Sequence, residues 1–516
     1  MSDLTKSAEK NLQKMRDYFS EAADLKVRVF FTGPERRDQI ILLFIEGLAD
    51  KNVIDRDIIQ PLTTGSWHFT KKGLLSSGGF FHSVKKNVST SVINEIKCFD
   101  EAVETLLRGD TVIFVDGAET AIGAATQDYE KRSVAEPQSE AVIRGPREGF
   151  TESLQTNTSM VRRKIRNHHL KLMELVVGEQ TKTRISIAYI EGIADMGIVD
   201  EVKRRISRIK TDAILESGYI EQYIEDAPFS LFATVSYTEK PDVVAGKLLE
   251  GRVAVLVDGT PFVLCVPYLF IESFQTSEDY YVRFIYASLS RWMRMIAFII
   301  TILLPALYVA TTTFHHEVIP TDLLVTLAAA REGVPFPAMV EVVVMGLIFE
   351  ILKEAGIRLP RAVGQAVSIV GAVVIGESAV SSGLIGAPVV MVTALTAITS
   401  YVVPNLGNTT PILRLMLVFL SGGLGLYGIM LGVSVVLIHL CAMRSFGIAY
   451  LSPFAPVSLS GLQDSVYFRA PLWAMIKRPQ LIARINPKRQ EILQRPRPPK
   501  NKDEGSPMDE KDGSGK

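Results

Sequence analysis

This chain has few cysteines and no net charge, and each of these features argues against a class of function. Only three cysteines occur in 516 residues, far apart and without the spacing of metal ligands. Such a sparse, odd count fits a reducing compartment. Lys plus Arg and Asp plus Glu are 56 each, so no overall basic field attracts nucleic acid. We therefore expect no metal centre and no nucleic-acid partner.

Catalytic motifs are also missing. The chain has no Gly-rich phosphate loop and no Ser or Cys nucleophile motif. Its adjacent His168 and His169 have no cysteine nearby, and neighbouring side chains on a helix point apart. Residues 1–37 are polar and charged, without the apolar core of a signal peptide. We predict a protein that is not an enzyme, needs no cofactor and keeps its N-terminal part in the cytosol.

Long apolar runs are absent from the first part of the chain and dominate it from Met293 to Phe446. A membrane-crossing helix needs about 20 mostly apolar residues. Lys and Arg gather before the first run and after the last one, which places both ends in the cytosol and requires an even number of crossings. Five candidates are visible, and a sixth comes either from residues 323–330 or from a break of 412–443 at residues 421–423. The five are residues 293–314, 336–352, 362–384, 389–403 and 413–443.

The part before these runs repeats itself. Residues 44–50 (FIEGLAD) return as residues 189–195 (YIEGIAD). Residues 111–117 (TVIFVDG) return, at nearly the same spacing, as residues 253–259 (VAVLVDG). Two similar segments in the same order indicate that a whole subdomain was duplicated.

Each copy predicts a small α/β unit. A continuous apolar run is typical of a strand buried on both faces, and in each copy a helix and a second strand follow it. The second strand ends in Asp116-Gly117 or Asp258-Gly259, a strong turn signal. A hairpin turn is the favoured interpretation, because no partner base or nucleophile accompanies either aspartate as catalysis would need. The predicted fold class is an α/β soluble N-terminal region of two repeated subdomains, followed by an all-α polytopic membrane domain.

Changes in composition give the domain boundaries. Residues 130–166, between the two copies, are rich in Pro, Ser, Arg and Glu, which indicates either a solvated loop or an ordered strap. Arginines of such a strap can pair with carboxylates or with the phosphates of membrane lipid. The candidates for assembly contacts are Arg144, Arg147, Glu148, Arg162 and Arg163. The predicted parts are subdomain 1 (1–130), the strap (131–166), subdomain 2 (167–285), a transmembrane domain of five or six spans (286–446), a basic cytosolic segment (447–494) and a disordered tail (495–516).

Several longer motifs carry a family resemblance. They are EPQSE at residues 136–140 with GFTE at 149–152, PFP at 335–337 and PRAVGQAVSIVG at 360–371 followed by IGE at 375–377. The chain resembles the A subunit of the GerA spore germination family from about Val27 to about Pro479. The resemblance fits both a nutrient-receptor A subunit and the paralogue encoded with dipicolinate-channel proteins.

The resemblance implies a place and partners. Family members are expected in the spore inner membrane as multi-pass proteins, beside a transporter-like B subunit that binds the germinant and a lipoprotein C subunit. A subunits are expected to assemble as pentamers into a nutrient-gated channel that releases monovalent cations and starts germination. Two alternatives stay open, a secondary transporter and a non-conducting scaffold or signalling subunit. The visible repeat lies in the soluble part rather than among the apolar runs, which weighs against a transporter.

Residues 362–384 are the best candidate for lining a pore, because they mix small and polar side chains with apolar ones. Small residues also let helices pack closely in lipid, so helix packing is the alternative. Glu377 favours the pore, since a carboxylate inside a membrane segment is costly unless it faces water or a partner. A hydrogen-bonded Glu377 near the outer interface is its other interpretation. The pore-lining candidates are Gln365, Val367, Ser368, Val370, Gly371, Val374, Ile375, Glu377, Ser378 and Ser382.

Two further carboxylates lie on the apolar run at residues 336–352. Glu341 and Glu350 are nine residues apart, so they face opposite sides of a helix. Arg331, in the stretch before them, is the expected partner of Glu341. Polar anchoring at a subunit contact is the simplest role for these three residues.

Overall fold

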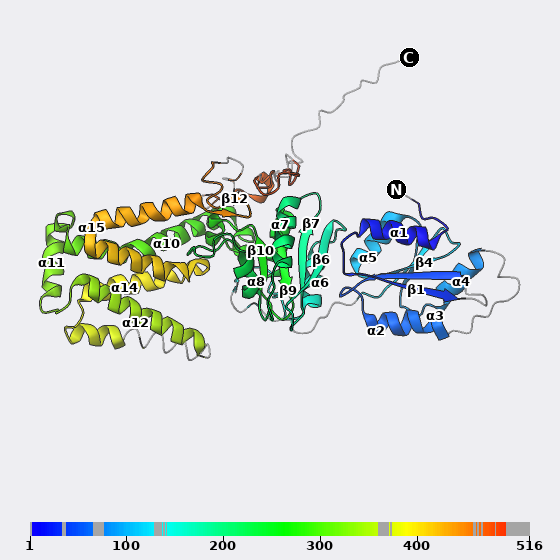
Figure 1. Ribbon diagram of the computed structural model, residues 1–516, viewed down its shortest axis with the longest axis horizontal. Helices are drawn as coiled ribbons and strands as arrows, with labels where there is room; N and C mark the ends of the chain where they lie inside the picture. The colour runs from blue at the N-terminus through cyan, green and yellow to red at the C-terminus, as the bar shows by residue number, and fades with distance from the viewer. Residues whose placement is uncertain are drawn as a thin grey trace, which may run out of the picture.

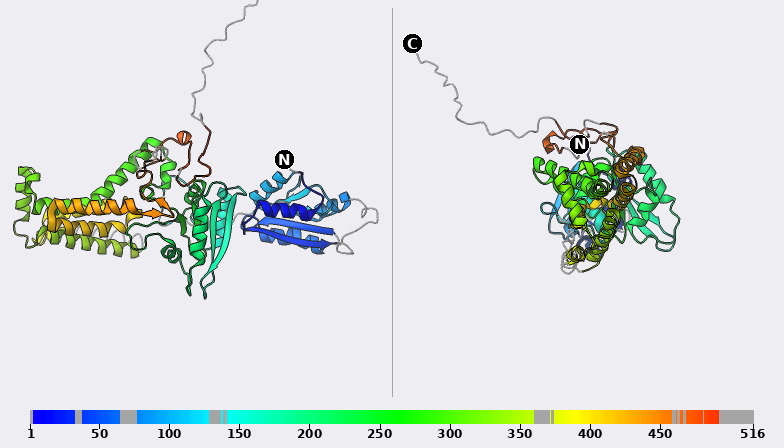
Figure 2. Two further views of the ribbon diagram at one scale, coloured as in Figure 1. Left: turned by 45° about the horizontal axis from the view of Figure 1, so that its top comes forward. Right: turned by 90° about the vertical axis from the view of Figure 1, so that its left-hand side faces the viewer.

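The computed structural model describes residues 3–32, 38–64, 77–127, 137, 140, 142–359, 371, 374–457, 461, 464–465, 468–479 and 481–491. The molecule is elongated, with one α/β unit at one end, a second in the middle and a bundle of helices at the other end (Figures 1 and 2).

The first unit is a five-stranded antiparallel sheet with the strand order β1-β2-β4-β5-β3. Alternate residues of its central strands point to opposite faces, and helices cover both. Helices α1 and α5 pack on Ile41 and Leu43, whereas α3, α4 and the π-helical turn η1 pack on Ile40 and Leu42. The elements are α1 (Ala8–Tyr18), β1 (Leu25–Thr32), β2 (Asp38–Ile45), α2 (Lys51–Val53), η1 (Ile54–Ile59), α3 (Gln60–Thr64), α4 (Ser77–Asn87), β3 (Ile93–Ile96), α5 (Phe99–Arg108), β4 (Thr111–Val115) and β5 (Ala121–Ala124).

The second unit has the same architecture. Its strand order, β6-β7-β9-β10-β8, matches that of the first sheet position by position. Helices α6 and α9 cover one face, packing on Ala188 and Ala254, and α7 and α8 cover the other, packing on Ile187 and Val255. The elements are α6 (Leu154–Lys164), β6 (Leu170–Val177), β7 (Thr183–Ile190), α7 (Met196–Ser207), α8 (Ser217–Ile224), β8 (Ser236–Thr238), α9 (Pro241–Leu249), β9 (Val253–Val257) and β10 (Val263–Val266). The α/β prediction for this region is confirmed.

The two Asp-Gly pairs are turns between antiparallel strands, as predicted, and each also caps a helix. In the first unit Asp116 Oδ1 accepts a hydrogen bond from the backbone N of Ala8, at the start of α1, at 3.2 Å. In the second, Asp258 Oδ1 accepts one from the backbone N of Leu154, at the start of α6, at 3.1 Å. A side chain that satisfies a free helix-terminal N–H contributes about 1 kcal/mol. The aspartates therefore stabilise corresponding helices in both copies.

A short segment of the first unit joins it to the second. The backbone N of Ala23 donates to Leu172 O at 3.1 Å, so residues before β1 extend the free edge of β6. Beside this contact, the guanidinium of Arg162 is fully buried and makes two bonds to Asp24, from Nε at 2.8 Å and from Nη2 at 3.0 Å. A bidentate Arg–carboxylate pair fixes orientation as well as distance.

The helical end begins with α10 (Phe284–Thr313), and α10 and α15 are each long and apolar enough to cross a membrane. The other named elements of this region are η2 (Phe270–Phe274), η3 (Ser277–Tyr280), η4 (His316–Val318), α11 (Thr321–Arg331), α12 (Ala338–Arg358), α14 (Ala387–Ser400), η5 (Pro404–Leu406) and α15 (Thr409–Ala442). Residues 374–381, between α12 and α14, are helical as well.

Helix α15 is broken at Gly425, whose φ of 61° and ψ of −141° are not helical. A Cβ on Gly432 would lie 2.7 Å from Leu417 Cδ2, so the residues after the break pack on those before it. Thr409 and His439, near the two ends, both bond to the loop at Ser230 and Leu231. The two arms of α15 therefore run back along each other, and the break lies just beyond the predicted residues 421–423.

The chain then returns to the second unit. A short hairpin of β11 (Arg444–Ser445) and β12 (Ile448–Ala449) places Tyr450 and Phe446 in one apolar core with strands β7, β9 and β10 and the bases of α10 and α15. The turn η7 (Leu472–Ala474) follows, and Ile482 joins the same core. The described part of the predicted cytosolic segment at 447–494 is thus packed against the second unit.

Candidate functional site in the helical region

Glu341, near the start of α12, links three helices. Its side chain is 1% exposed. It accepts a hydrogen bond from Arg331 Nη2 of α11 at 3.2 Å and another from the backbone N of Gly386 at 2.8 Å. Gly386 is the N-cap residue of α14, where the helix dipole favours a negative charge, and Arg331 stands in the last turn of α11, where it favours a positive one. The expected partner Arg331 is found in place.

Glu350, on the opposite side of α12, pairs with a different helix. Arg414 Nη2, on the first arm of α15, donates to Glu350 Oε1 at 2.9 Å, and Lys353 Nζ lies 3.9 Å from Oε2. Arg414 is 9% exposed within an apolar helix. We did not predict this arginine as a site residue, although a single charge inside the run at 413–443 is a usable signal.

Only part of the predicted pore-lining stripe falls on described residues. Gln365, Val367, Ser368 and Val370 lie outside them. Gly371 and residues 374–381 are helical. Ideal Cβ atoms on Gly371 and Gly376 would lie 3.1 Å from Leu352 of α12 and 3.3 Å from Val390 of α14, so these two glycines face the chain's own helices.

Several other positions of the same helix are exposed in the single chain. Val374 is 54% exposed, and Glu377 and Ser378 are exposed as well, whereas Ile375 is half-buried. Ser382, just past the helix, is exposed. The polar residues Glu377, Ser378 and Ser382 therefore point away from the helical bundle of their own chain.

A buried ion-pair network joins the base of α10 to the soluble part and to the C-terminal segment. Arg291 is fully buried, with Nε 2.9 Å from Asp279 Oδ2 and Nη1 2.7 Å from Asp464 Oδ1. Arg294 makes two further bonds of 2.9 Å to Asp279. Tyr280 donates to Asp464 Oδ2 at 2.6 Å. Burial, followed by the charge of Asp464, raises the pKa of the Tyr280 hydroxyl. Breaking a buried pair typically costs 3–5 kcal/mol, so the three segments are firmly joined.

The predicted assembly residues separate into two groups. Arg162 is used inside the chain, in the pair with Asp24 that joins the two α/β units. Arg163 Nη2 lies 2.7 Å from Glu148 Oε1, which holds the strap on α6. Arg144 and Arg147 are exposed.

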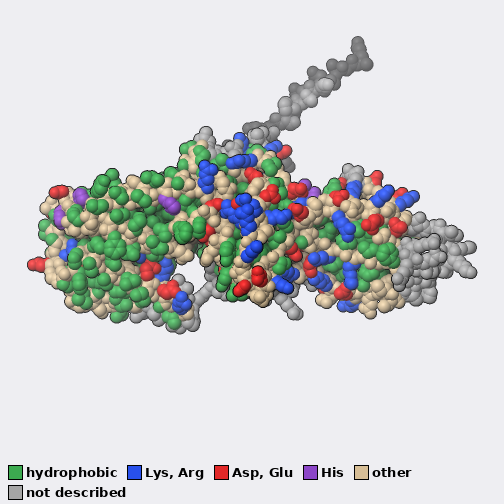
Figure 3. Space-filling view, viewed as in Figure 1, with side chains coloured by type: hydrophobic (Ala, Val, Ile, Leu, Met, Phe, Trp, Pro, Cys, Tyr) green, Lys and Arg blue, Asp and Glu red, His purple; other side chains and the backbone are tan. Residues whose placement is uncertain are grey.

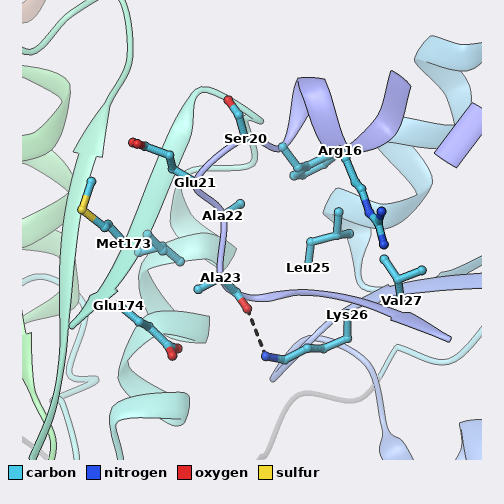
Figure 4. A pocket seen from close by; sticks show the side chains of 12 residues that line it. Arg16, Ser20, Glu21, Ala22, Ala23, Leu25, Lys26, Val27, Met173 and Glu174 are labelled. Atoms are coloured by element: carbon cyan, nitrogen blue, oxygen red, sulfur yellow. Dashed lines mark hydrogen bonds between the residues drawn. The ribbon is translucent and has the colours of Figure 1, made fainter. Parts of the chain in front are cut away.

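A groove opens between the two α/β units (Figure 4). Its volume is about 550 Å³, and its lining comes from the end of α1, the joining segment, β1 and β6. Glu21 lines it and accepts a hydrogen bond from Tyr189 of β7, and burial followed by this carboxylate raises the pKa of Tyr189. Lys26 Nζ donates to Ala23 O at 3.0 Å. No group of three or more His, Cys, Asp or Glu that could hold a metal occurs among the described residues.

The fold and these contacts define a class of protein: a duplicated α/β unit mounted on an apolar helical bundle that carries internal ion pairs. The model of the Bacillus/Clostridium GerA spore germination protein family matches residues 13–481. The chain belongs to this family, which confirms the resemblance.

Individual relatives are similar over most of their length. Spore germination protein KA of Bacillus subtilis is 44% identical over 497 residues, covering 96% of this chain and 90% of the relative. The uncharacterized membrane protein YfkQ of the same organism is 39% identical, covering 94% and 93%. The crystal structure of the N-terminal domain of the A subunit of the Bacillus megaterium spore germinant receptor GerK3 is 33% identical and covers 52% of this chain and 98% of that domain, with a TM-score of 0.42.

Proposed function

We propose that this chain is the A subunit of a spore germinant receptor, which assembles with copies of itself into a nutrient-gated channel for monovalent cations. The observation that carries the proposal is the family match over residues 13–481, which spans the α/β units and the helices together. The proposed partners are a transporter-like B subunit and a lipoprotein C subunit, and the proposed location is the spore inner membrane.

The proposed topology has six crossings. They are α10, α12, the helix through residues 374–381, α14 and the two arms of α15, so that both ends of the helical region are on the cytosolic side. Support comes from the buried Glu341 and the partly exposed Glu350, because each carboxylate is paired with an arginine from another helix. Pairing of this kind is what makes charges tolerable at membrane depth.

The proposed pore is lined by the exposed side of the helix at residues 374–381. A face with Glu377 and Ser378 is costly against lipid and well suited to water. Repeated around an axis, Glu377 would attract cations to the pore mouth. The apolar Val374 would form part of a hydrophobic barrier that gates by excluding water.

The test is cation flux through the purified, full-length chain reconstituted in vesicles, with the mass of the complex measured in detergent. We expect an assembly larger than a monomer and a flux in which cations exceed anions. Glu377→Gln should lower that selectivity without changing the mass. Glu354→Gln is the matched control, because Glu354 is an exposed carboxylate paired with Arg358 at the end of α12. A folded assembly without flux, or equal selectivity in both variants, would contradict the proposed channel.

A further inference from the structure

The strap between the two α/β units presents a mixed basic and apolar surface. Ile143 is 90% exposed, and Arg144 and Arg147 beside it are exposed as well. The segment is held in place at Gly145, between the two arginines, and at Phe150, just after them. The backbone N of Phe150 donates to Glu239 O at 2.7 Å, and a Cβ on Gly145 would lie 2.7 Å from the ring of Tyr281. One exposed isoleucine is ordinary on a protein surface, so the case for a contact surface rests on the two arginines beside it and on their complement elsewhere in the chain.

Helix α8 presents the complementary combination, aromatic and acidic. Tyr219 is 45% exposed and Tyr223 is 54% exposed. Glu221 and Glu225 lie on the opposite flank of the helix, across its exposed side from the two tyrosines. Neither side chain has a hydrogen bond or ion pair to the residues that the structure describes. Burial, followed by the charges of Glu225 and Glu216, raises the pKa of Glu221 to about 7. A cation placed against this face would relieve the repulsion among the carboxylates.

The two surfaces lie on opposite sides of the second sheet. The strap is held on the side of α6 and α9, through the contact of Glu148 with Arg163 and through Tyr281, which donates to Asp242 of α9. Helix α8 packs on the other face of the sheet with α7. A side view of the molecule shows that charged side chains of both signs gather over this unit, while the helical end is largely apolar (Figure 3).

The two surfaces also lie near the same end of the unit, toward the helical bundle. Tyr281, against the strap, stands just before α10 begins. Asp226, just after α8, accepts from the backbone N of Phe446, shortly after α15 ends. The strap and α8 are therefore at similar heights along the long axis of the helical bundle. A second copy related by a rotation about that axis can place its strap against the α8 of the first copy.

We propose that the strap surface of one chain, Ile143, Arg144 and Arg147, docks on the α8 surface of a second copy, Tyr219, Glu221, Tyr223 and Glu225. The partner is a second copy because this chain itself carries both complementary surfaces. The strap would lie across the exposed side of α8, so that Ile143 packs on the flank of the two tyrosines and the arginines reach the carboxylates on the other flank. A contact between two different surfaces repeats head to tail and closes into a ring when the rotation permits. This inference rests on the proposed self-assembly and names its contact in the α/β part.

Cysteine cross-linking between differently tagged full-length chains tests the contact. The background carries Cys98→Ser, Cys265→Ala and Cys441→Ser. One chain then receives Ile143→Cys and the other Tyr223→Cys. We expect covalent dimers in the mixed pair and only background levels when both chains carry the same substitution. A chain that carries both substitutions should give a ladder of covalent oligomers.

Charge reversal provides the second arm. Arg144→Glu with Arg147→Glu, and separately Glu221→Arg with Glu225→Arg, should each reduce the assembled fraction, and the four changes together on one chain should restore it. The matched control swaps Glu104 and Arg108, an exposed pair on α5 of the first unit, and should leave assembly unchanged. An assembly that shows neither the mixed cross-link nor the rescue would overturn this contact and leave the proposed channel standing. A monomeric protein would overturn both.

Discussion

The two α/β units share one fold but hold very different positions in the molecule. The second unit shares a continuous apolar core with the bases of α10 and α15 and with the returning C-terminal segment. The first has its own two cores and meets the second at the segment before β1. The corresponding edge strands differ as well, because β6 receives that segment at Leu172. Each strand also keeps an exposed apolar residue, Phe31 at 58% on β1 and Val176 at 62% on β6.

This difference suggests how a duplication was put to two uses. The copy that touches the bundle gained a buried ionic joint and the acidic helix α8. The helix of the first unit that corresponds to α8 is α4, which has two lysines in its last turn and no carboxylate. The first α/β unit has the same fold, but its described residues take no part in the buried ion-pair network of Arg291. A force on the second unit therefore reaches α10 and α15 directly, while one on the first unit reaches them through its contacts with the second unit, such as the pair of Asp24 with Arg162.

The largest expected effect breaks the joint that only the second unit has. Arg291→Gln leaves the two carboxylates of the joint with one arginine, because Arg294 bonds to Asp279 while Asp464 loses its arginine partner. We expect a loss of about 3–5 kcal/mol in the free energy of unfolding, since an uncompensated buried charge remains. Urea unfolding of the full chain in detergent measures it. Arg283→Gln, an exposed arginine at the start of α10, is the control and should stay near the parent. Equal stability of the Arg291→Gln and Arg283→Gln variants would show that this ion-pair network does not hold the second unit to the helices.

A smaller effect compares corresponding positions in the two copies. Asp116→Ala and Asp258→Ala each remove one helix cap, at a cost of about 1 kcal/mol. Hydrogen exchange should then rise in α1 and its neighbours for the first variant. For the second it should also rise at the base of α10, because the second unit shares its core with that helix. Glu119→Ala, on the first hairpin but not capping, is the control. Identical, strictly local patterns in both variants would show that the copies are not coupled differently.

Sequence patterns predicted the parts of this comparison that depend on local chemistry. The repeated motifs located both α/β units, and the Asp-Gly pairs located both hairpins. The Arg331–Glu341 pair was predicted from two charges ten residues apart on either side of a helix break. A break in the last apolar run was one of two alternatives for the sixth span, placed at residues 421–423, and the structure has it at Gly425. Each of these features is decided by residues close together in the sequence.

Contacts between distant segments were out of reach. Arg291 was visible as a charge before the first apolar run, but nothing in the sequence specifies that Asp464 meets it. The pair of Arg414 with Glu350 depends in the same way on how α12 and α15 pack. The packing of the C-terminal segment was missed because its basic composition is typical of a solvated region, while its few apolar residues, such as Tyr450 and Ile482, fill the core.

The most direct test of the channel is whether water reaches the exposed side of the helix at residues 374–381 in the assembled protein. Single cysteines at Val374, Glu377, Ser378 and Ile375, in the background without native cysteines, would be exposed to a water-soluble thiol reagent. The account predicts fast reaction at Glu377 and Ser378, and slow reaction at the half-buried Ile375 and at Val374, where the hydrophobic barrier excludes water. Uniform protection of all four, at normal protein levels and normal assembly, would mean that this face meets lipid or protein, and the proposed pore would be wrong.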